Sequence, residues 1–137
     1  MRQLETGVDA DGRSCIVSER LTEPSGDIAI DMPFETAANP PPRPLGNGEL
    51  HDLGLPVGAI RVLVVQWPPG YQASIHHTDT IDVSTVTEGS IDIVLDDGPH
   101  TPEAGDSVIV TGVDHGWHAG PDGATVTGVL LGTASPE

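Results

Sequence analysis

The sequence contains no lysine, and its five basic residues are all arginine, set against 21 acidic residues for a formal net charge of -16. A chain this acidic repels phosphate backbones and anionic headgroups, so roles on nucleic acid or membrane surfaces are disfavoured. The absence of lysine also excludes Schiff-base chemistry and a lysine general base. Any chemistry must therefore come from histidine, carboxylate and hydroxyl side chains.

Cysteine and long apolar runs are equally scarce. The single cysteine, Cys15, cannot form an internal disulfide, and no run approaches the roughly 20 apolar residues that cross a bilayer as a helix. The N-terminus lacks a basic region followed by an apolar core of signal-peptide length. We therefore expect a cytoplasmic protein with no membrane partner.

Aromatic residues number only four, so the core must be built from Val, Ile and Leu. These occur in short runs of about five to eight residues, separated by turns rich in glycine and proline. No interval has a convincing helical period, which indicates an all-β chain closed into a sandwich or barrel of seven or more antiparallel strands. Strands are expected at 59–67, 71–77, 81–87, 90–95, 106–110, 115–119 and 124–132.

The part of the chain before these strands is irregular. Turn residues over 6–12 precede one expected strand at 13–18, and a long Pro-rich connection contains a possible short strand at 27–31. We therefore expect one structural domain in two parts. Residues 1–57 form an N-terminal strand and an arm packed on the barrel, and residues 58–137 form the barrel.

Two adjacent histidines lie on one of the expected strands. Because side chains alternate between the faces of a strand, His76 and Thr78 share one face and His77 points to the other, unless a bulge at the strand end turns it inward. On the next strand Asp82 and Ser84 share a face, which we take to be the same interior. An imidazole and a carboxylate then converge, as a divalent metal requires.

The order of these residues resembles the first motif of the cupin superfamily, the double-stranded β-helix jelly rolls. That motif runs Gly, five residues, His-x-His, three or four residues, Glu, six residues, Gly. Here the corresponding positions are Gly70, His76, Thr78, Asp82 and Gly89. Thr78 stands where the second His is usual, and Asp82 where Glu is usual.

The second cupin motif is Gly-Asp, an apolar strand, a turn and then His-x-Trp-x-Asn. It resembles the stretch that begins at Gly105 and ends with His115, Trp117 and His118. This stretch is one residue shorter before the His, and His118 replaces the Asn. The two motifs together cover about residues 58–132 and imply a cupin barrel.

The resemblance implies a metal held by His76, Asp82 and His115, with open positions for substrate, water or O₂. The ion would be one divalent transition metal, Fe, Zn, Mn or Ni. Asp82 is either a direct ligand or an acceptor that orients one. Thr78 would support a bound water or substrate hydroxyl. His118 is out of phase with His115, so it would be a fourth ligand only through a local bend, or else a pocket acid or base. Tyr71, Ser84 and Trp117 would line the substrate pocket.

Cupins have many functions, so two hypotheses follow. The favoured one is a metal-dependent enzyme acting on a small organic carboxylate or phenolic compound, with dioxygenase-like or lyase-, isomerase- or decarboxylase-like chemistry. The alternative is a non-enzymatic module that binds or senses a small ligand. The expected partners are a small-molecule substrate and a second copy of the chain, with Ile16, Val62 and Val64 as candidates for the buried sheet faces of a homodimer. His51 and His100 are expected to be solvated surface residues.

Overall fold

The computed structural model describes residues 1–23 and 34–136, so the short strand expected at 27–31 lies outside the described residues. The described residues contain strands and no helix, which confirms the all-β prediction. In chain order the strands are β1 (Arg2–Val8), β2 (Ser14–Leu21), β3 (Glu49–Leu50), β4 (Ile60–Trp67), β5 (Gln72–His77), β6 (Thr80–Leu95), β7 (Gly98–His100), β8 (Ser107–Val110) and β9 (His115–Gly132).

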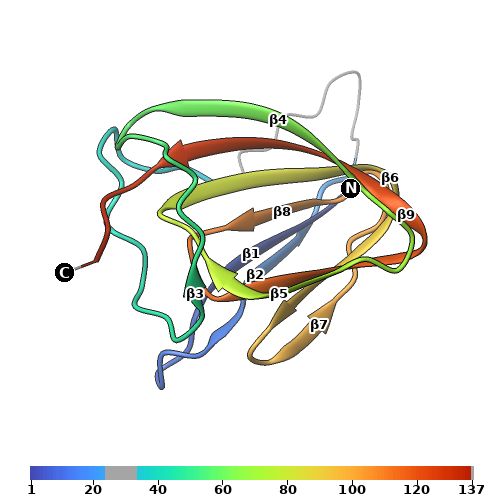
Figure 1. Cartoon of the computed structure of the whole chain (residues 1–137), viewed down its shortest axis with the longest axis horizontal. Coiled ribbons are helices and arrows are strands. Elements are labelled where there is room, and N and C mark those ends of the chain that lie inside the picture. The colour runs from blue at the N-terminus through green and yellow to red at the C-terminus, as the bar shows by residue number, and fades with distance from the viewer. Residues whose placement is uncertain (24–33, 137) are drawn as a thin grey trace.

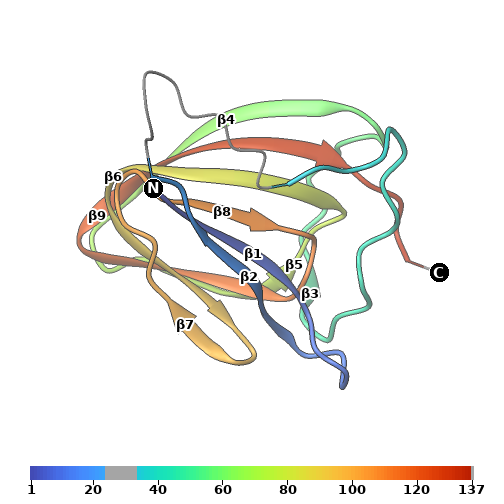
Figure 2. The ribbon, with the colours of Figure 1, turned by 180° about the vertical axis from the view of Figure 1, so that it is seen from behind.

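All nine strands belong to one sheet that curls into a half-open barrel (Figures 1 and 2). The sheet runs in the order β2-β1-β8-β6-β9-β5-β3, with β4 paired to β9 and β7 paired to β6. Most pairs are antiparallel as expected, but β1–β8 and β3–β5 are parallel. The sheet is therefore mixed, because the N-terminal segment and the arm each add a strand beside a distant part of the chain.

Strands β6 and β9 are long because each joins two of the strands expected from the sequence. Both bend sharply at the same end of the barrel and contribute to its two opposite walls (Figure 1). At the bend Gly89 and Gly123 have φ angles of +71° and +78°, which favour glycine. A side chain on Gly89 would collide with the carbonyl oxygen of Gly123. The predicted turns are thus bends inside continuous strands.

The core is aliphatic, as the scarcity of aromatic residues predicts. Side chains of β1, β6 and β8 meet in one cluster, and those of β6 and β9 meet in a second, which Trp67 and Trp117 cover. The clusters consist of Leu4, Ile93, Leu95, Val108, Val110 and Val113, and of Val86, Ile91, Ala124 and Val126.

The N-terminal segment differs from the expectation of a single strand after a turn. Strands β1 and β2 form a hairpin, and the turn is confined to 9–12, where Asp9 accepts hydrogen bonds from the backbone N–H groups of Asp11 and Arg13. Strand β1 also pairs with β8, and Leu4 is buried in the core. The segment therefore belongs to the same sheet as the barrel, because its apolar face completes the core.

The proposed dimer residues lie in different environments. Ile16 packs partly buried against the core, whereas Val62 and Val64 on the outer face of β4 are 67% and 64% exposed. The homodimer itself stays a prediction. None of the described residues forms a helix long and apolar enough to cross a membrane.

Candidate functional site

A cavity of about 320 Å³ opens between the two walls of the barrel. It contains seven of the eight residues that the sequence predicts for the site, because they lie on β5, β6 and β9 or directly before or after β5. The cavity is lined by His51, Leu53, Leu63, Val65, Trp67, Tyr71, Ala73, His76, Thr78, Asp82, Ser84, His115, Trp117, Val126 and Leu130.

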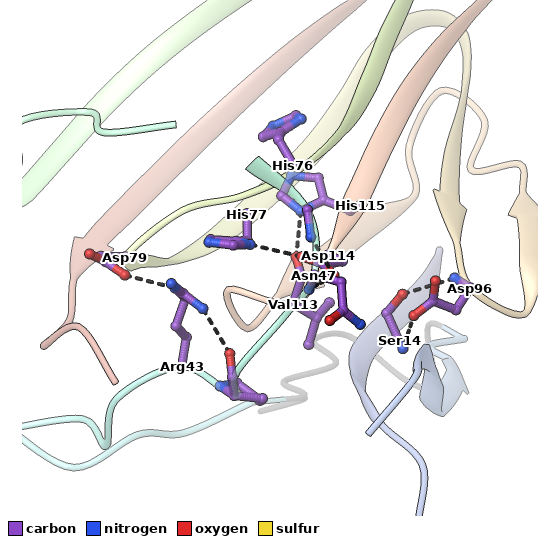
Figure 3. Close-up of polar contacts among 12 residues, drawn as sticks. Ser14, Arg43, Asn47, His76, His77, Asp79, Asp96, Val113, Asp114 and His115 are labelled. Atoms are coloured by element: carbon purple, nitrogen blue, oxygen red, sulfur yellow. Dashed lines mark hydrogen bonds and ion pairs between the residues drawn. The ribbon is translucent and has the colours of Figure 1, made fainter. Parts of the chain in front are cut away.

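Two imidazoles form the polar end of this cavity. His76 of β5 lies directly opposite His115 of β9, and their ring centroids are 4.5 Å apart (Figure 3). Each Nδ1 donates a hydrogen bond of 2.8 Å to a backbone carbonyl, that of Ser74 for His76 and that of Val113 for His115. A carbonyl only accepts, so the proton sits on Nδ1 and each Nε2 keeps its lone pair.

Both rings are uncharged at neutral pH. Burial, together with the neighbouring His76, lowers the pKa of His115 from 6.5 to about 4. Burial likewise lowers the pKa of His76, although the hydrogen bond to Ser74 opposes this. The pair is therefore ready to donate two neutral imidazole nitrogens, the form that binds a metal or accepts a proton.

Asp82 lies on the wall of the same cavity. Its Oδ1 is buried and has no hydrogen-bond partner. Burial raises the pKa of this carboxyl from 3.8 to about 6, while the hydroxyl of Thr80 acts in the opposite direction. The same hydroxyl contacts Thr78 at 2.8 Å, so a chain of hydroxyl groups lies beside the carboxyl. A carboxyl with such a pKa is suited to proton transfer near neutral pH.

The predicted metal site fits the structure in part. The two imidazoles have the chemistry of metal ligands, and backbone carbonyls fix their orientation as partners of ligating histidines commonly do. Among the residues that the structure describes, however, no three His, Cys, Asp or Glu side chains form a group that could hold an ion. The three-residue set of His76, Asp82 and His115 therefore stays a prediction.

His77 points away from the cavity, as the strand alternation predicts. Its Nδ1 lies 2.8 Å from Oδ1 of Asp114, and both side chains are buried (Figure 3). The other oxygen of Asp114 accepts hydrogen bonds from the backbone N–H groups of Asn47 and Gly48 at 2.6 and 3.0 Å. Asp114 thus ties the arm to the barrel beside the two cavity histidines.

His51 is exposed, as expected for a solvated surface residue, but its position at the cavity was not predicted. Its ring stacks on that of His76 with centroids 4.1 Å apart and lines the cavity mouth. Strand β3 pairs in parallel with β5 and so brings His51 to the cavity, where the backbone N–H of His51 donates to the carbonyl of His77. No local pattern signals this, because the pairing joins residues distant in sequence.

Two other histidines lie away from the cavity. His118 pairs with Gln72 of β5 and is absent from the cavity wall, because it is an odd number of residues from His115. Its predicted role as a ligand or pocket acid is therefore not supported. His100 is a partly exposed residue of β7 whose Nε2 contacts Asp97 at 2.7 Å, in accord with the surface prediction.

The position of the two motifs decides the fold. The first motif runs through β5 into β6, and the second runs through β8 into β9. Their histidines face each other inside the curled sheet. The chain has the cupin fold. Its departures from the motifs include Thr78 and Asp82, which line the cavity in place of a second histidine and a Glu, and His118, which does not line it.

Comparison with known sequences gives partial likenesses. No protein-family model matches this chain. Phomopsin biosynthesis cluster proteins C' and D of Diaporthe leptostromiformis are 35% and 36% identical to it over 66 and 64 residues. These matches cover 47% and 46% of this chain but 34% and 33% of the relatives, so the matched part spans about a third of their length.

Solved structures similar to this chain include an RmlC-like cupin from Shewanella frigidimarina, with 26% identity and a TM-score of 0.47 over 52% of this chain and 64% of the other. A sugar phosphate isomerase of the cupin superfamily from Silicibacter pomeroyi has 26% identity and a TM-score of 0.43, covering 56% and 52%. KdgF from Halomonas sp. has 18% identity and a TM-score of 0.45, covering 52% and 67%. Likenesses of this size support no conclusion about activity.

Proposed function

We propose that this cupin is a small metal-dependent enzyme that moves a proton on a small organic molecule bound in the cavity. The observation that supports this best is that two uncharged imidazoles and a buried carboxyl, whose pKa is raised to about 6, line the same cavity. Groups of these two kinds in one cavity are typical of acid–base catalysis. The names of the two relatives, which refer to a biosynthesis cluster, favour an enzyme over a sensing module.

In this proposal His76 and His115 hold the ion through their Nε2 atoms, and the carbonyls of Ser74 and Val113 keep both rings in place. A divalent transition metal bound there would supply a Lewis acid that polarises a substrate oxygen. The donor set of two imidazoles suits several such metals and leaves their identity open.

Asp82 is the group that accepts or returns the proton. Asp82 lines the cavity, and its Oδ1 makes no hydrogen bond within the protein, so that oxygen is not already committed to another group. The hydroxyl groups of Thr78 and Ser84 lie on the same wall and can orient a substrate oxygen. This arrangement favours isomerase- or lyase-like chemistry over the dioxygenase alternative, because it provides a proton acceptor with a suitable pKa.

Metal content after dialysis against a mild chelator tests the first half of the proposal. Wild-type protein is expected to keep a stoichiometric ion, whereas His76→Ala and His115→Asn lose it. His115→Asn retains a side-chain N–H that can bond to Val113, which limits damage to the fold. His100→Ala is the matched control, because it removes a histidine outside the cavity. Full metal content in both cavity variants would refute the site.

The Asp82→Asn variant tests the second half. If Asp82 transfers protons, this variant keeps its metal but loses catalysis of C–H exchange with D₂O, measured by NMR on a panel of small carbonyl and hydroxyl compounds. If Asp82 is instead a third ligand, the metal itself is lost. Retained exchange activity at the wild-type rate would exclude Asp82 as the proton acceptor.

A further inference from the structure

The few aromatic side chains of this chain are gathered at the cavity. The sequence has two Trp, one Tyr and one Phe, and Trp67, Tyr71 and Trp117 all line the same space. They come from the end of β4, from the turn before β5 and from β9. Trp67 and Tyr71 lie 5.4 Å apart in a tilted arrangement, and Trp117 meets the ring of His115 edge-on at 5.8 Å. Three of the four aromatic side chains therefore lie where a ligand in the cavity would contact them, although the core is otherwise aliphatic.

The size of the cavity suits a small ring compound. A cavity of about 150 Å³ holds benzene, and the space here is about 320 Å³. The lining combines Leu63, Val65, Val126 and the aromatic rings with hydroxyl groups and Asp82. An apolar ring with one polar substituent therefore matches the distribution of side chains.

The charge of the cavity restricts that substituent. The chain has no lysine, and none of its five arginines lines the cavity. Arg2 contacts Asp106, Arg43 contacts Asp79, and Arg61 donates to the carbonyl of Leu53. The residues left out of the structural description contain no arginine, so they cannot supply the missing cation. The protein therefore offers no fixed positive charge to a carboxylate, while Asp82 can add only a negative one.

We infer that the metal-free cavity selects an uncharged aromatic molecule with a hydroxyl, amide or carbonyl group, and that it rejects the matching carboxylate. An anion would enter only where a bound cation offsets its charge, because a buried unpaired charge is strongly disfavoured. Of the two substrate classes expected from the sequence, the phenolic one is thus the class that the protein alone accepts. The inference rests on the proposed function only in taking this cavity as the substrate site.

Tryptophan fluorescence tests the inference directly, because both tryptophans of the chain line the cavity. Metal-free protein at pH 8, where an ordinary imidazole is neutral, is titrated with benzamide and with benzoate, two probes of similar shape that differ in charge. We expect saturable quenching by benzamide and binding of benzoate that is weaker by about tenfold or more. Equal affinity for the two probes, or no saturable effect of benzamide, would overturn the inference.

A gain of binding provides the second measurement. Leu53 lies at the cavity mouth and is 37% exposed, so Leu53→Lys places a cation beside the ligand with little risk to the fold. Leu45→Lys is the matched control, since Leu45 is 70% exposed and lies outside the cavity. We expect benzoate affinity to rise several-fold in Leu53→Lys alone. An equal rise in both variants would show that only the net charge matters and would overturn the inference.

The metal measurements separate this inference from the proposed function. If the wild-type protein binds no metal and the benzamide preference is still observed, the proposed enzyme mechanism fails and the charge selectivity stands. If metal binds as proposed but benzoate competes equally in the metal-free protein, the mechanism stands and the charge selectivity fails.

Discussion

Replacement of Asp82 by Asn is expected to change how the stability of the protein depends on pH. Burial raises the pKa of this carboxyl from 3.8 to about 6. A group whose pKa is higher in the folded than in the unfolded protein stabilises the folded state fully when the pH is below the unfolded-state pKa. This stabilisation is lost as the pH rises through the folded-state pKa. Wild-type protein should therefore lose stability between about pH 4 and pH 7 on account of Asp82.

The size of the effect follows from the two pKa values. Their difference of about two units corresponds to about 3 kcal/mol of unfolding free energy. Asn cannot ionise, so the stability of the variant relative to wild type should rise by about this amount from about pH 4 to pH 7. Any fixed effect of the amide on packing shifts the difference equally at each pH.

Urea unfolding followed by tryptophan fluorescence, at several pH values and with a chelator present, measures this difference. Asp122→Asn is the matched control, because Asp122 is exposed and its substitution should change stability by less than about 0.5 kcal/mol. A stability difference between Asp82→Asn and wild type that stays constant from about pH 4 to pH 7 would refute the buried, partly protonated carboxyl.

Three further predictions concern the metal, the N-terminal hairpin and the outer face of the barrel. Burial lowers the pKa of His115 to about 4, so acid should release a bound ion only at a pH well below the ordinary histidine pKa of 6.5. Metal content measured as a function of pH checks this, and release centred at pH 6.5 would contradict it. Deletion of residues 1–20 should prevent stable folding. Leu4→Ala alone should lower the unfolding free energy, measured with urea, by about 2–5 kcal/mol, and a loss below about 1 kcal/mol would contradict the burial of Leu4 in the core. If the predicted homodimer uses the exposed face of β4, Val62→Asp with Val64→Asp should sediment as a monomer while wild type sediments as a dimer.

The sequence predicted the cavity wall well wherever strand alternation decides the direction of a side chain. His76, Thr78, Asp82 and Ser84 all line the cavity, because their spacing keeps them on one face across the corner between β5 and β6. The same rule explains why His118 does not join them.

What the sequence did not predict depends on contacts between distant residues. His51 reaches the cavity only because β3 pairs with β5 and because Asp114 fixes the preceding backbone. The continuity of β6 and β9 is likewise decided by the close approach of Gly89 to Gly123, which a turn signal in the sequence cannot distinguish from a chain reversal.

Asp114 fixes the arm at Asn47 and Gly48. The part of the cavity wall that the arm supplies can therefore be changed without changing the part that the barrel strands supply. The barrel strands carry His76 and His115, whereas the mouth is formed in part by His51 and Leu53 of the arm. A side chain at Gly46 or Gly48 would collide with Asp114, so both positions must remain glycine for the arm to keep this attachment. Residues beyond them are free of that limit, and exchanging 52–55 for other loops offers a way to redesign the ligand preference of the barrel while its reactive end stays intact.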